Sequence, residues 1–329
     1  MVVTKETSRV LHLQCPVCAR TFNVTEVNTF ARCENCGDNP LLATYSLQGL
    51  TINDIDRTDR SMWRYAVLLP LLDQRNKITL GEGWTPMLNA ERLARRYNFT
   101  NLFIKDESAN PTGSFKARGL SMAVSKAFEL GIKTCIVPTA GNAGGALSAY
   151  CAKAGMKAIV VMPRHTPEAF KKDCAFFGAE VIEVDGLISD CAKKVAELKQ
   201  QHDCFDVSTM KEPYRLEGKK TMGYEIAEQF NWALPDVILY PTGGGTGLIG
   251  MWKAFQEMVT MGWIEDKMPR MIAVQAENCK PVVASFEGKQ VNAKNYKGRA
   301  TLANGLAVPN PFAEKLILQT LRESGGLAI

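Results

Sequence analysis

The stretch 105–120, KDESANPTGSFKARGL, places a lysine at the start of a predicted helix. NPTG is typical of a turn, and Ser114 stands where the N-cap of a helix is expected. Helix-forming and apolar residues follow, so Lys116 falls in the first turn, where the helix dipole disfavours a cation. A lysine whose charge is discouraged by this position and by burial is more easily a neutral amine, which can react with an aldehyde. The alternative is an ordinary solvated surface lysine.

Four of the ten cysteines are paired near the N-terminus, in the motifs C-P-V-C and C-E-N-C, which are separated by fourteen residues. Each CxxC turn directs two thiolates at one point, as a tetrahedral zinc site requires. The sequence therefore predicts a structural zinc held by Cys15, Cys18, Cys33 and Cys36. Disulfides are the alternative. The other six cysteines are scattered through apolar segments, and we interpret them as core residues.

From residue 101 onward, short apolar runs alternate with amphipathic segments. Strands are predicted at 102–104, 134–139, 157–163, 180–184, 204–209, 236–242 and 270–276, with helices such as 167–178 and 188–202 between them. The strand at 102–104 is expected to be short and buried. This alternation indicates an α/β fold with parallel sheets and helices on both faces. Ligands in such folds bind at the carboxyl ends of the strands. The loops that follow the strands are therefore the candidate site.

Two of these loops are rich in glycine. TAGNAGG follows the strand at 134–139, and TGGGTG follows the strand at 236–242; each leads into a predicted helix. Backbone amides at a helix N-terminus form an anion site, so two such loops suggest a ligand with two anionic ends, or a cofactor phosphate and a substrate carboxylate. The segment 245–250 also fits GxGxxG, with Glu277 closing the next strand, so a dinucleotide site is a second interpretation. It would leave Lys116 and the Asn142 loop without a purpose.

Composition limits the class of protein. The chain has 329 residues, 46% hydrophobic and 22% charged, with a net charge of +5 and no long run of lysine or arginine. This balance is ordinary for a globular enzyme and does not suggest binding to nucleic acid or to a membrane surface. The first residues lack the apolar core of a signal peptide, and no apolar run reaches membrane-spanning length. We therefore expect a cytoplasmic enzyme with a small-molecule substrate.

These motifs resemble a known family. SFKARG with NPTG before it, TAGNAGG and TGGGTG are similar to motifs of pyridoxal-phosphate enzymes of the tryptophan-synthase-β fold type. GEGWTPML, DESANPTGSFKARG and KEPYRLEGKKTMGYEIAEQF resemble the threonine synthase family more closely, many members of which begin with a zinc ribbon. The resemblance covers most of residues 10–329. It implies conversion of O-phospho-L-homoserine and water to L-threonine and phosphate, and a homodimer.

The resemblance also implies roles for individual residues. Lys116 would hold pyridoxal 5'-phosphate covalently and move protons, Phe115 would pack near the cofactor ring, and Asn142 would hydrogen-bond the ring hydroxyl. The phosphate loop and the substrate loop follow from the same motifs. The cofactor phosphate would be bound by Gly243, Gly244, Gly245, Thr246 and Gly247, and the substrate by Thr85, Thr139, Ala140, Gly141, Ala143 and Arg215, with Arg215 on the substrate phosphate.

The implied architecture is a zinc ribbon at 1–46, a small α/β domain at 98–220, and a large α/β domain made of 47–97 and 221–329. The sequence ends where a further strand is predicted to open, so we expect part of the large domain to be missing, including the group opposite the pyridine nitrogen. Threonine synthases carry hydroxyl residues where this chain has Ala140 and Ala143. A β-eliminating amino-acid lyase and a non-catalytic binding or regulatory homologue therefore stay open as alternatives.

Overall fold

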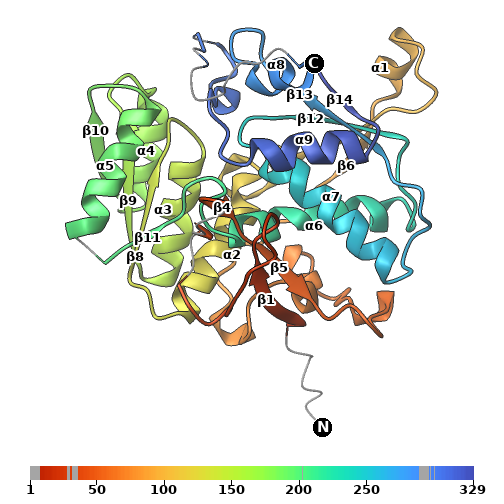
Figure 1. Cartoon of the computed structure of the whole chain (residues 1–329), viewed down its shortest axis with the longest axis horizontal. Coiled ribbons are helices and arrows are strands. Elements are labelled where there is room, and N and C mark those ends of the chain that lie inside the picture. Colours follow the sequence, from red (N-terminus) through yellow and green to blue (C-terminus); the bar gives the residue numbers. More distant parts are fainter. Residues whose placement is uncertain are drawn as a thin grey trace.

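The computed structural model describes residues 8–27, 30–31, 36–201, 203–288, 296, 298–299 and 301–329. Two parallel sheets dominate these residues, and helices α2, α6 and α7 lie between the parts of the chain that carry them (Figure 1). Of the antiparallel N-terminal strands, β1 and β5 lie below these helices in the same view. None of the helices in the described ranges is both long and apolar enough to cross a membrane.

The larger sheet has the strand order β10-β9-β8-β11, with every pair parallel. Its strands and covering helices are β8 (Thr134–Pro138), α3 (Ala143–Ala154), β9 (Lys157–Pro163), α4 (Glu168–Phe176), β10 (Glu180–Val184), α5 (Ile188–Gln201) and β11 (Phe205–Asp206). Successive side chains of a strand point to opposite faces. Ile159 and Val161 accordingly pack with α5 residues, whereas Val160 and Met162 join the main core with α3 and α4. The predicted helices on both faces are confirmed.

The second sheet has the order β12-β13-β14, also parallel. It is built with its helices from β12 (Val237–Pro241), α7 (Thr246–Thr260), β13 (Arg270–Val274), α8 (Pro281–Phe286), the 3-10 turn η7 (Asn304–Leu306), α9 (Glu314–Glu323) and β14 (Leu327–Ala328). The last residues of the sequence do form a strand, since Leu327 and Ala328 pair with β13. The loop after β12 therefore leads directly into the N-terminus of α7.

Helices α2 (Lys116–Glu129), α6 (Tyr214–Gln229) and α7 pack at very short range because glycine lies at their contacts. A Cβ on Gly119 of α2 would come within 2.9 Å of the Arg215 carbonyl oxygen, and one on Gly218 within 2.2 Å of the Arg118 carbonyl oxygen. On the other side of α6, a Cβ on Gly250 of α7 would lie 3.1 Å from the Lys220 nitrogen. Glycine allows such close backbone approach.

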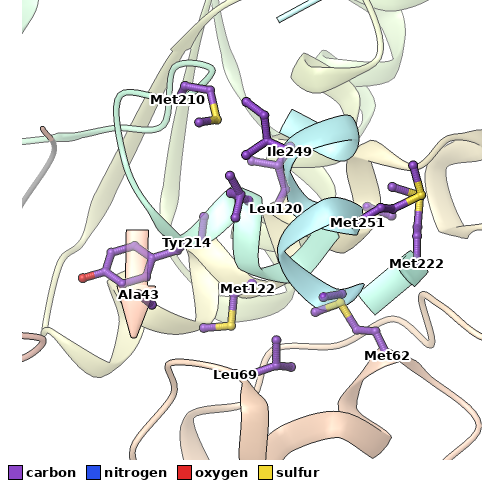
Figure 2. Close-up of a cluster of buried hydrophobic side chains, with 14 of the residues drawn as sticks. Ala43, Met62, Leu69, Leu120, Met122, Met210, Tyr214, Met222, Ile249 and Met251 are labelled. Carbon is purple, nitrogen blue, oxygen red and sulfur yellow. The ribbon is translucent and has the colours of Figure 1, made fainter. Parts of the chain in front are cut away.

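Close packing buries α6 almost completely, from Tyr214 to Ala227. Figure 2 shows the apolar core around it, with Leu120 and Met122 from α2, and Ile249 and Met251 from α7. Methionine fills irregular gaps between helices that meet at several angles.

The N-terminal unit is antiparallel, with the order β2-β1-β5 and a separate β3-β4 pair. Its strands are β1 (Val10–Gln14), β2 (Thr21–Phe22), β3 (Phe30–Ala31), β4 (Asn39–Pro40) and β5 (Leu42–Tyr45). Tyr45, at the end of β5, donates a hydrogen bond of 2.7 Å to Glu217 of α6. Its ring also lies 3.9 Å from the Lys220 nitrogen. The unit is thus attached to the helix that carries Arg215.

The segment between this unit and α2 is made of short elements: the 3-10 helices η1 (Ile52–Asp54), η2 (Met62–Leu68) and η3 (Gln74–Asn76), then β6 (Met87–Asn89), α1 (Glu91–Arg96), β7 (Phe103–Lys105), η4 (Glu107–Ala109) and η5 (Pro111–Gly113). The strand predicted at 102–104 exists as β7, but the expectation that it is buried is wrong. It pairs only with β6, and Phe103 and Ile104 are 39% and 47% exposed. A strand of three residues with one partner at the edge has too few neighbours to cover its side chains.

Candidate active site

Lys116 is the first residue of α2, as the sequence predicts. The N-cap is Phe115 rather than Ser114, although the Ser114 hydroxyl still accepts a hydrogen bond of 3.3 Å from the Lys116 amide. The Lys116 nitrogen lies 3.9 Å from the centre of the Phe115 ring. Since the side chain is partly buried against an aromatic face, Lys116 is not an ordinary solvated lysine.

The glycine-rich loop 242–245 connects β12 to α7, and its residues 243–245 line a cavity that Lys116 also lines. Gly245 has φ +77°, a left-handed conformation that favours glycine, and it precedes Thr246, the first residue of α7. Gly244 packs against Thr209, and Gly247 packs against the hydroxyl of Tyr240. The loop therefore presents backbone amides at a helix N-terminus, which is an anion-binding arrangement. Lys116, Phe115 and residues 243–247 all line this one cavity.

Positive charge is concentrated beside this cavity. Arg215 and Lys219, both on α6, are each 1% exposed. Burial, and then the positive charge of Arg215, lower the pKa of Lys116 to about 7. In a large fraction of the molecules, Lys116 is consequently a neutral amine near physiological pH. Burial is one of the expected causes, and the guanidinium of Arg215 is a further cause that the residues around Lys116 do not reveal.

This pKa gives a testable expectation for the protein without cofactor. Lys116 should react with a trace of acetic anhydride at a rate that rises with pH and reaches half its maximum near pH 7, because only the neutral amine is nucleophilic. An exposed lysine titrates near 10.4. Mass spectrometry of the labelled peptides measures, in one sample, how the labelling of Lys116 and that of the exposed lysines depend on pH. A midpoint for Lys116 near that of the exposed lysines would contradict the assignment.

Arg215 keeps part of its hydrogen-bonding capacity free. One guanidinium nitrogen donates to the Val207 carbonyl oxygen at 2.5 Å, but Nε and Nη2 have no partner among the described residues. Glu212 accepts hydrogen bonds from the amides of Tyr214 and Arg215, and its Oε1 is also unpaired within the described structure. Burial raises the pKa of the Glu212 carboxyl to about 7 despite the opposing charge of Arg215. Buried unpaired donors of this kind fit an anionic ligand.

The asparagine loop follows β8 as predicted. The Thr139 hydroxyl accepts a hydrogen bond from the Gly141 amide at 3.2 Å, which shapes the turn. Ala143 is the first residue of α3, and Asn142 is its N-cap with an exposed side chain that does not cap the helix. Neither Asn142 nor Ala140 lines the cavity between Lys116 and the glycine loop. Their roles stay predictions.

Thr85 is buried, and its hydroxyl is engaged by two charged side chains. It donates to Glu107 at 2.6 Å and accepts from Arg118 at 3.2 Å. Arg118 in turn binds Glu225 through both carboxylate oxygens, at 2.5 and 2.8 Å. Thr85 thus belongs to a buried network of charges, and it does not line the cavity. Its predicted contact with substrate stays a prediction.

Lys219, Thr209 and Tyr240 line the cavity and are not among the site residues that the sequence predicts. Lys219 lies within the motif KEPYRLEGKKTMGYEIAEQF, and its charge is typical of a residue on an exposed helix. The spacing of apolar residues does not reveal that Lys219 is buried, because almost all of α6 is buried whatever the residue type. Tyr240 could have been predicted as a site residue, because it lies near the end of the strand that leads into the glycine loop.

Three of the four predicted metal ligands lie close together. The Sγ atoms of Cys15, Cys18 and Cys36 are within 4.8 Å of one another. Sulfurs around zinc at about 2.3 Å are roughly 3.8 Å apart, so the spacing is compatible with a shared ion. The first turn is held by a hydrogen bond of 2.9 Å from the Cys15 amide to the Arg20 carbonyl. Cys33 lies outside the described residues.

Comparison with known proteins identifies the class. Residues 78–329 match the model of the family described as pyridoxal-phosphate dependent enzyme. The chain belongs to this family of pyridoxal-phosphate-dependent enzymes. It is 32% identical to threonine synthase of Methanocaldococcus jannaschii, over 96% of this chain and 78% of that protein. It is 34% identical to threonine synthase of Methanosarcina acetivorans, over 96% of this chain and 77% of that protein.

Solved structures share the fold. Diaminopropionate ammonia lyase from Escherichia coli superposes with a TM-score of 0.62 at 20% identity, covering 74% of this chain and 68% of that one. The processed form of threonine deaminase isoform 2 from Solanum lycopersicum superposes with a TM-score of 0.61 at 23% identity, covering 80% of this chain and 73% of that one. The chain therefore has the α/β fold of pyridoxal-phosphate enzymes of the tryptophan-synthase-β type, as the sequence predicts.

Proposed function

We propose that this chain is a threonine synthase, a lyase that converts O-phospho-L-homoserine and water to L-threonine and phosphate. The observation that supports it most is that one cavity is lined both by Lys116 and by the glycine loop at the N-terminus of α7. The named relatives add the substrate, since they are threonine synthases at 32–34% identity over 96% of this chain.

The residues present fit pyridoxal 5'-phosphate. The amine with its lowered pKa is suited to bond the cofactor aldehyde, and the amides of Gly243–Gly247 with the Thr246 hydroxyl are suited to hold its phosphate. Phe115 would lie beside the ring, and Asn142 would approach the ring hydroxyl from α3. When bound, this cofactor withdraws electrons from the substrate carbons and so makes their protons acidic.

The chain's own groups would then carry out binding and proton transfer. The Lys116 nitrogen would take a proton from substrate carbon and return it, a role suited to a pKa of about 7. The unpaired Nε and Nη2 of Arg215 would bind the substrate phosphate and stabilise its negative charge as the phosphate leaves. The Thr139–Ala143 loop would receive the substrate carboxylate at the N-terminus of α3, and Thr85 would border the pocket.

The test is to give the purified protein O-phosphohomoserine and to assay free phosphate and threonine together. Equal amounts of both products support the proposal. A β-eliminating lyase, suggested by the absence of hydroxyls at Ala140 and Ala143, would instead release 2-oxo acid and ammonia from serine or threonine. A non-catalytic homologue would do neither. Either result would contradict the proposed function.

We also infer a small domain at 98–220 and a large domain made of 47–97 and 221–329, with closure between them. The four-stranded sheet falls within the first range and the three-stranded sheet within the second. Closure would exclude water until it is needed. A homodimer in the cytoplasm, with a small amino-acid substrate as its ligand, completes the proposal.

The N-terminal unit is proposed to bind one structural zinc through Cys15, Cys18, Cys33 and Cys36. The three clustered thiols support this, and hydrogen bonds from the Cys18 and Val17 amides, acting against burial, lower the pKa of the Cys15 thiol. A closed four-thiolate site would stabilise a unit too small to have a large core of its own.

Metal analysis should therefore find about one zinc per chain, because one such site binds one ion. Cys18→Ser should lose the metal and lower the temperature of unfolding, whereas Cys204→Ser, which changes a thiol far along the chain, should keep it. Protein produced with ample zinc that contains none would contradict this site.

A further inference from the structure

A second lysine shares the cavity with Lys116, and nothing above gives it a role. Lys219 lies on α6, is 1% exposed, and lines the cavity together with Lys116 and the glycine loop. Its Nζ donates a hydrogen bond of 3.0 Å to the hydroxyl of Thr246, the first residue of α7. In the part of the chain that the structure describes, this is its one hydrogen bond, and no carboxylate forms an ion pair with it.

The packing of α2 against α6 fixes this position. The nitrogens of Lys116 and Lys219 lie 3.9 and 4.8 Å from the centre of the same Phe115 ring, one from each helix. A Cβ on Gly119 would come within 3.0 Å of the Lys219 Cε. The absence of a side chain at 119 therefore leaves the space through which Lys219 reaches the cavity.

A buried cation that no carboxylate contacts is unfavourable, so this position calls for an anion. Burial lowers the pKa of Lys219 well below its ordinary value, the neighbouring charges of Arg215 and Lys116 lower it further, and the charge of Glu212 opposes this shift only in part. The hydrogen bond to Thr246 places the ammonium at the N-terminus of α7, where the loop amides also converge. An ammonium has three donors, so two remain after the bond to Thr246. Helix N-terminus, amides and ammonium together suit a phosphate monoester.

We propose that Lys219 is a direct ligand of the cofactor phosphate and supplies the positive charge that the loop lacks. The inference rests on the proposed function only in that it requires pyridoxal phosphate to be the occupant. Lys116 then remains available for the aldehyde and for proton transfer. The two lysines divide the work: one binds the phosphate end of the ligand and the other binds its aldehyde end.

The experiment compares cofactor-free protein with Lys219 intact, with Lys219→Gln and with Lys219→Arg. Each is titrated with pyridoxal phosphate and with pyridoxal, which lacks the phosphate, and tryptophan fluorescence reports the dissociation constant. Lys219→Gln should weaken binding of pyridoxal phosphate about 10- to 100-fold, the size of one charge-assisted hydrogen bond, and should change pyridoxal binding less than about 3-fold. Lys219→Arg should restore most of the affinity for pyridoxal phosphate, because it keeps the charge.

A second readout does not depend on the aldehyde. Inorganic phosphate should raise the unfolding temperature of the cofactor-free wild type and have a clearly smaller effect on Lys219→Gln. Lys126→Gln is the matched control, since it removes a buried lysine that pairs with Glu129 and does not line the cavity. It should leave the effect of phosphate unchanged relative to its own baseline.

The outcomes separate the two ideas. If the wild type binds no pyridoxal phosphate, the proposed function fails, and the role of Lys219 fails with it. If the wild type binds it and Lys219→Gln binds it equally well, only the role of Lys219 is overturned. An equal loss of pyridoxal phosphate and of pyridoxal would also overturn it, because Lys219 would then support the cavity without contacting the phosphate.

Discussion

Lys116→Ala is expected to reduce threonine formation by at least about 1,000-fold, since acid–base catalysis alone contributes 100- to 10,000-fold and the attachment of the cofactor is lost with the same amine. The Lys116 nitrogen lies 3.9 Å from the centre of the Phe115 ring, and Lys116 lines the cavity together with the glycine loop. Steady-state rates with O-phosphohomoserine, measured with excess cofactor, give the effect.

Two further variants make this prediction specific. Lys116→Arg keeps the charge but cannot bond an aldehyde, so it should be as inactive as alanine. Lys157→Ala removes an exposed lysine that pairs with Glu180, and it should leave the rate nearly unchanged. Retention of more than a tenth of the wild-type rate by Lys116→Ala would contradict the assigned role.

Arg118→Met is expected to lower the free energy of unfolding by about 3–5 kcal/mol, which is typical when one partner of a buried ion pair is removed. Arg118 is fully buried and binds both oxygens of Glu225 and both oxygens of Glu107. Lys105 adds a bond of 2.8 Å to Glu225. Methionine would leave the buried Glu225 with Lys105 as its one ion-pair partner in the described structure, and the partly buried Glu107 without its arginine. Urea unfolding followed by tryptophan fluorescence measures the loss.

The pH dependence follows from the same contacts. Burial alone would raise the pKa of Glu225, but Arg118 and Lys105 together hold it at about 2. Its stabilising contribution is therefore complete above the unfolded pKa of about 4.3 and is lost as pH falls toward 2. Arg118→Met should raise this pKa, so the variant should be less destabilised at pH 5 than at pH 8.

The control uses the same substitution at an exposed pair. Arg95→Met breaks a bond of 3.1 Å to Glu91 between side chains that are 79% and 63% exposed. It should change the free energy of unfolding by less than about 1 kcal/mol. If Arg118→Met were equally mild, the network around Glu225 would not stabilise the helices that carry the site.

Local sequence predicts many of the strands, helices and helix starts, because these depend on residues that are close together in the chain. The β8–α3–β9–α4–β10–α5 region follows from alternating apolar runs and helical periods, and its boundaries agree within a few residues. Lys116 at a helix start follows from the turn residues before it. The strand at Leu327–Ala328 follows from its apolar residues, whereas its parallel pairing with β13 comes from the structure.

The remaining features depend on contacts that local sequence does not encode. Helix α6 reads as a charged surface helix, yet it is buried between α2 and α7 because its charges find partners on other elements, as Glu225 does on α2 and β7. Lys219 was missed for that reason. The exposure of Phe103 likewise depends on β7 having a single neighbour, which its residues do not reveal.

The most direct measurement is reduction of the purified protein with borohydride in the presence of pyridoxal phosphate, followed by mass spectrometry of its peptides. The mass of the reduced cofactor should appear on Lys116 alone, and an absorbance band near the visible edge should disappear at the same time. Attachment at Lys219, or no attachment at any lysine, would contradict the account of a cavity in which Lys116 binds the aldehyde and the glycine loop binds the phosphate.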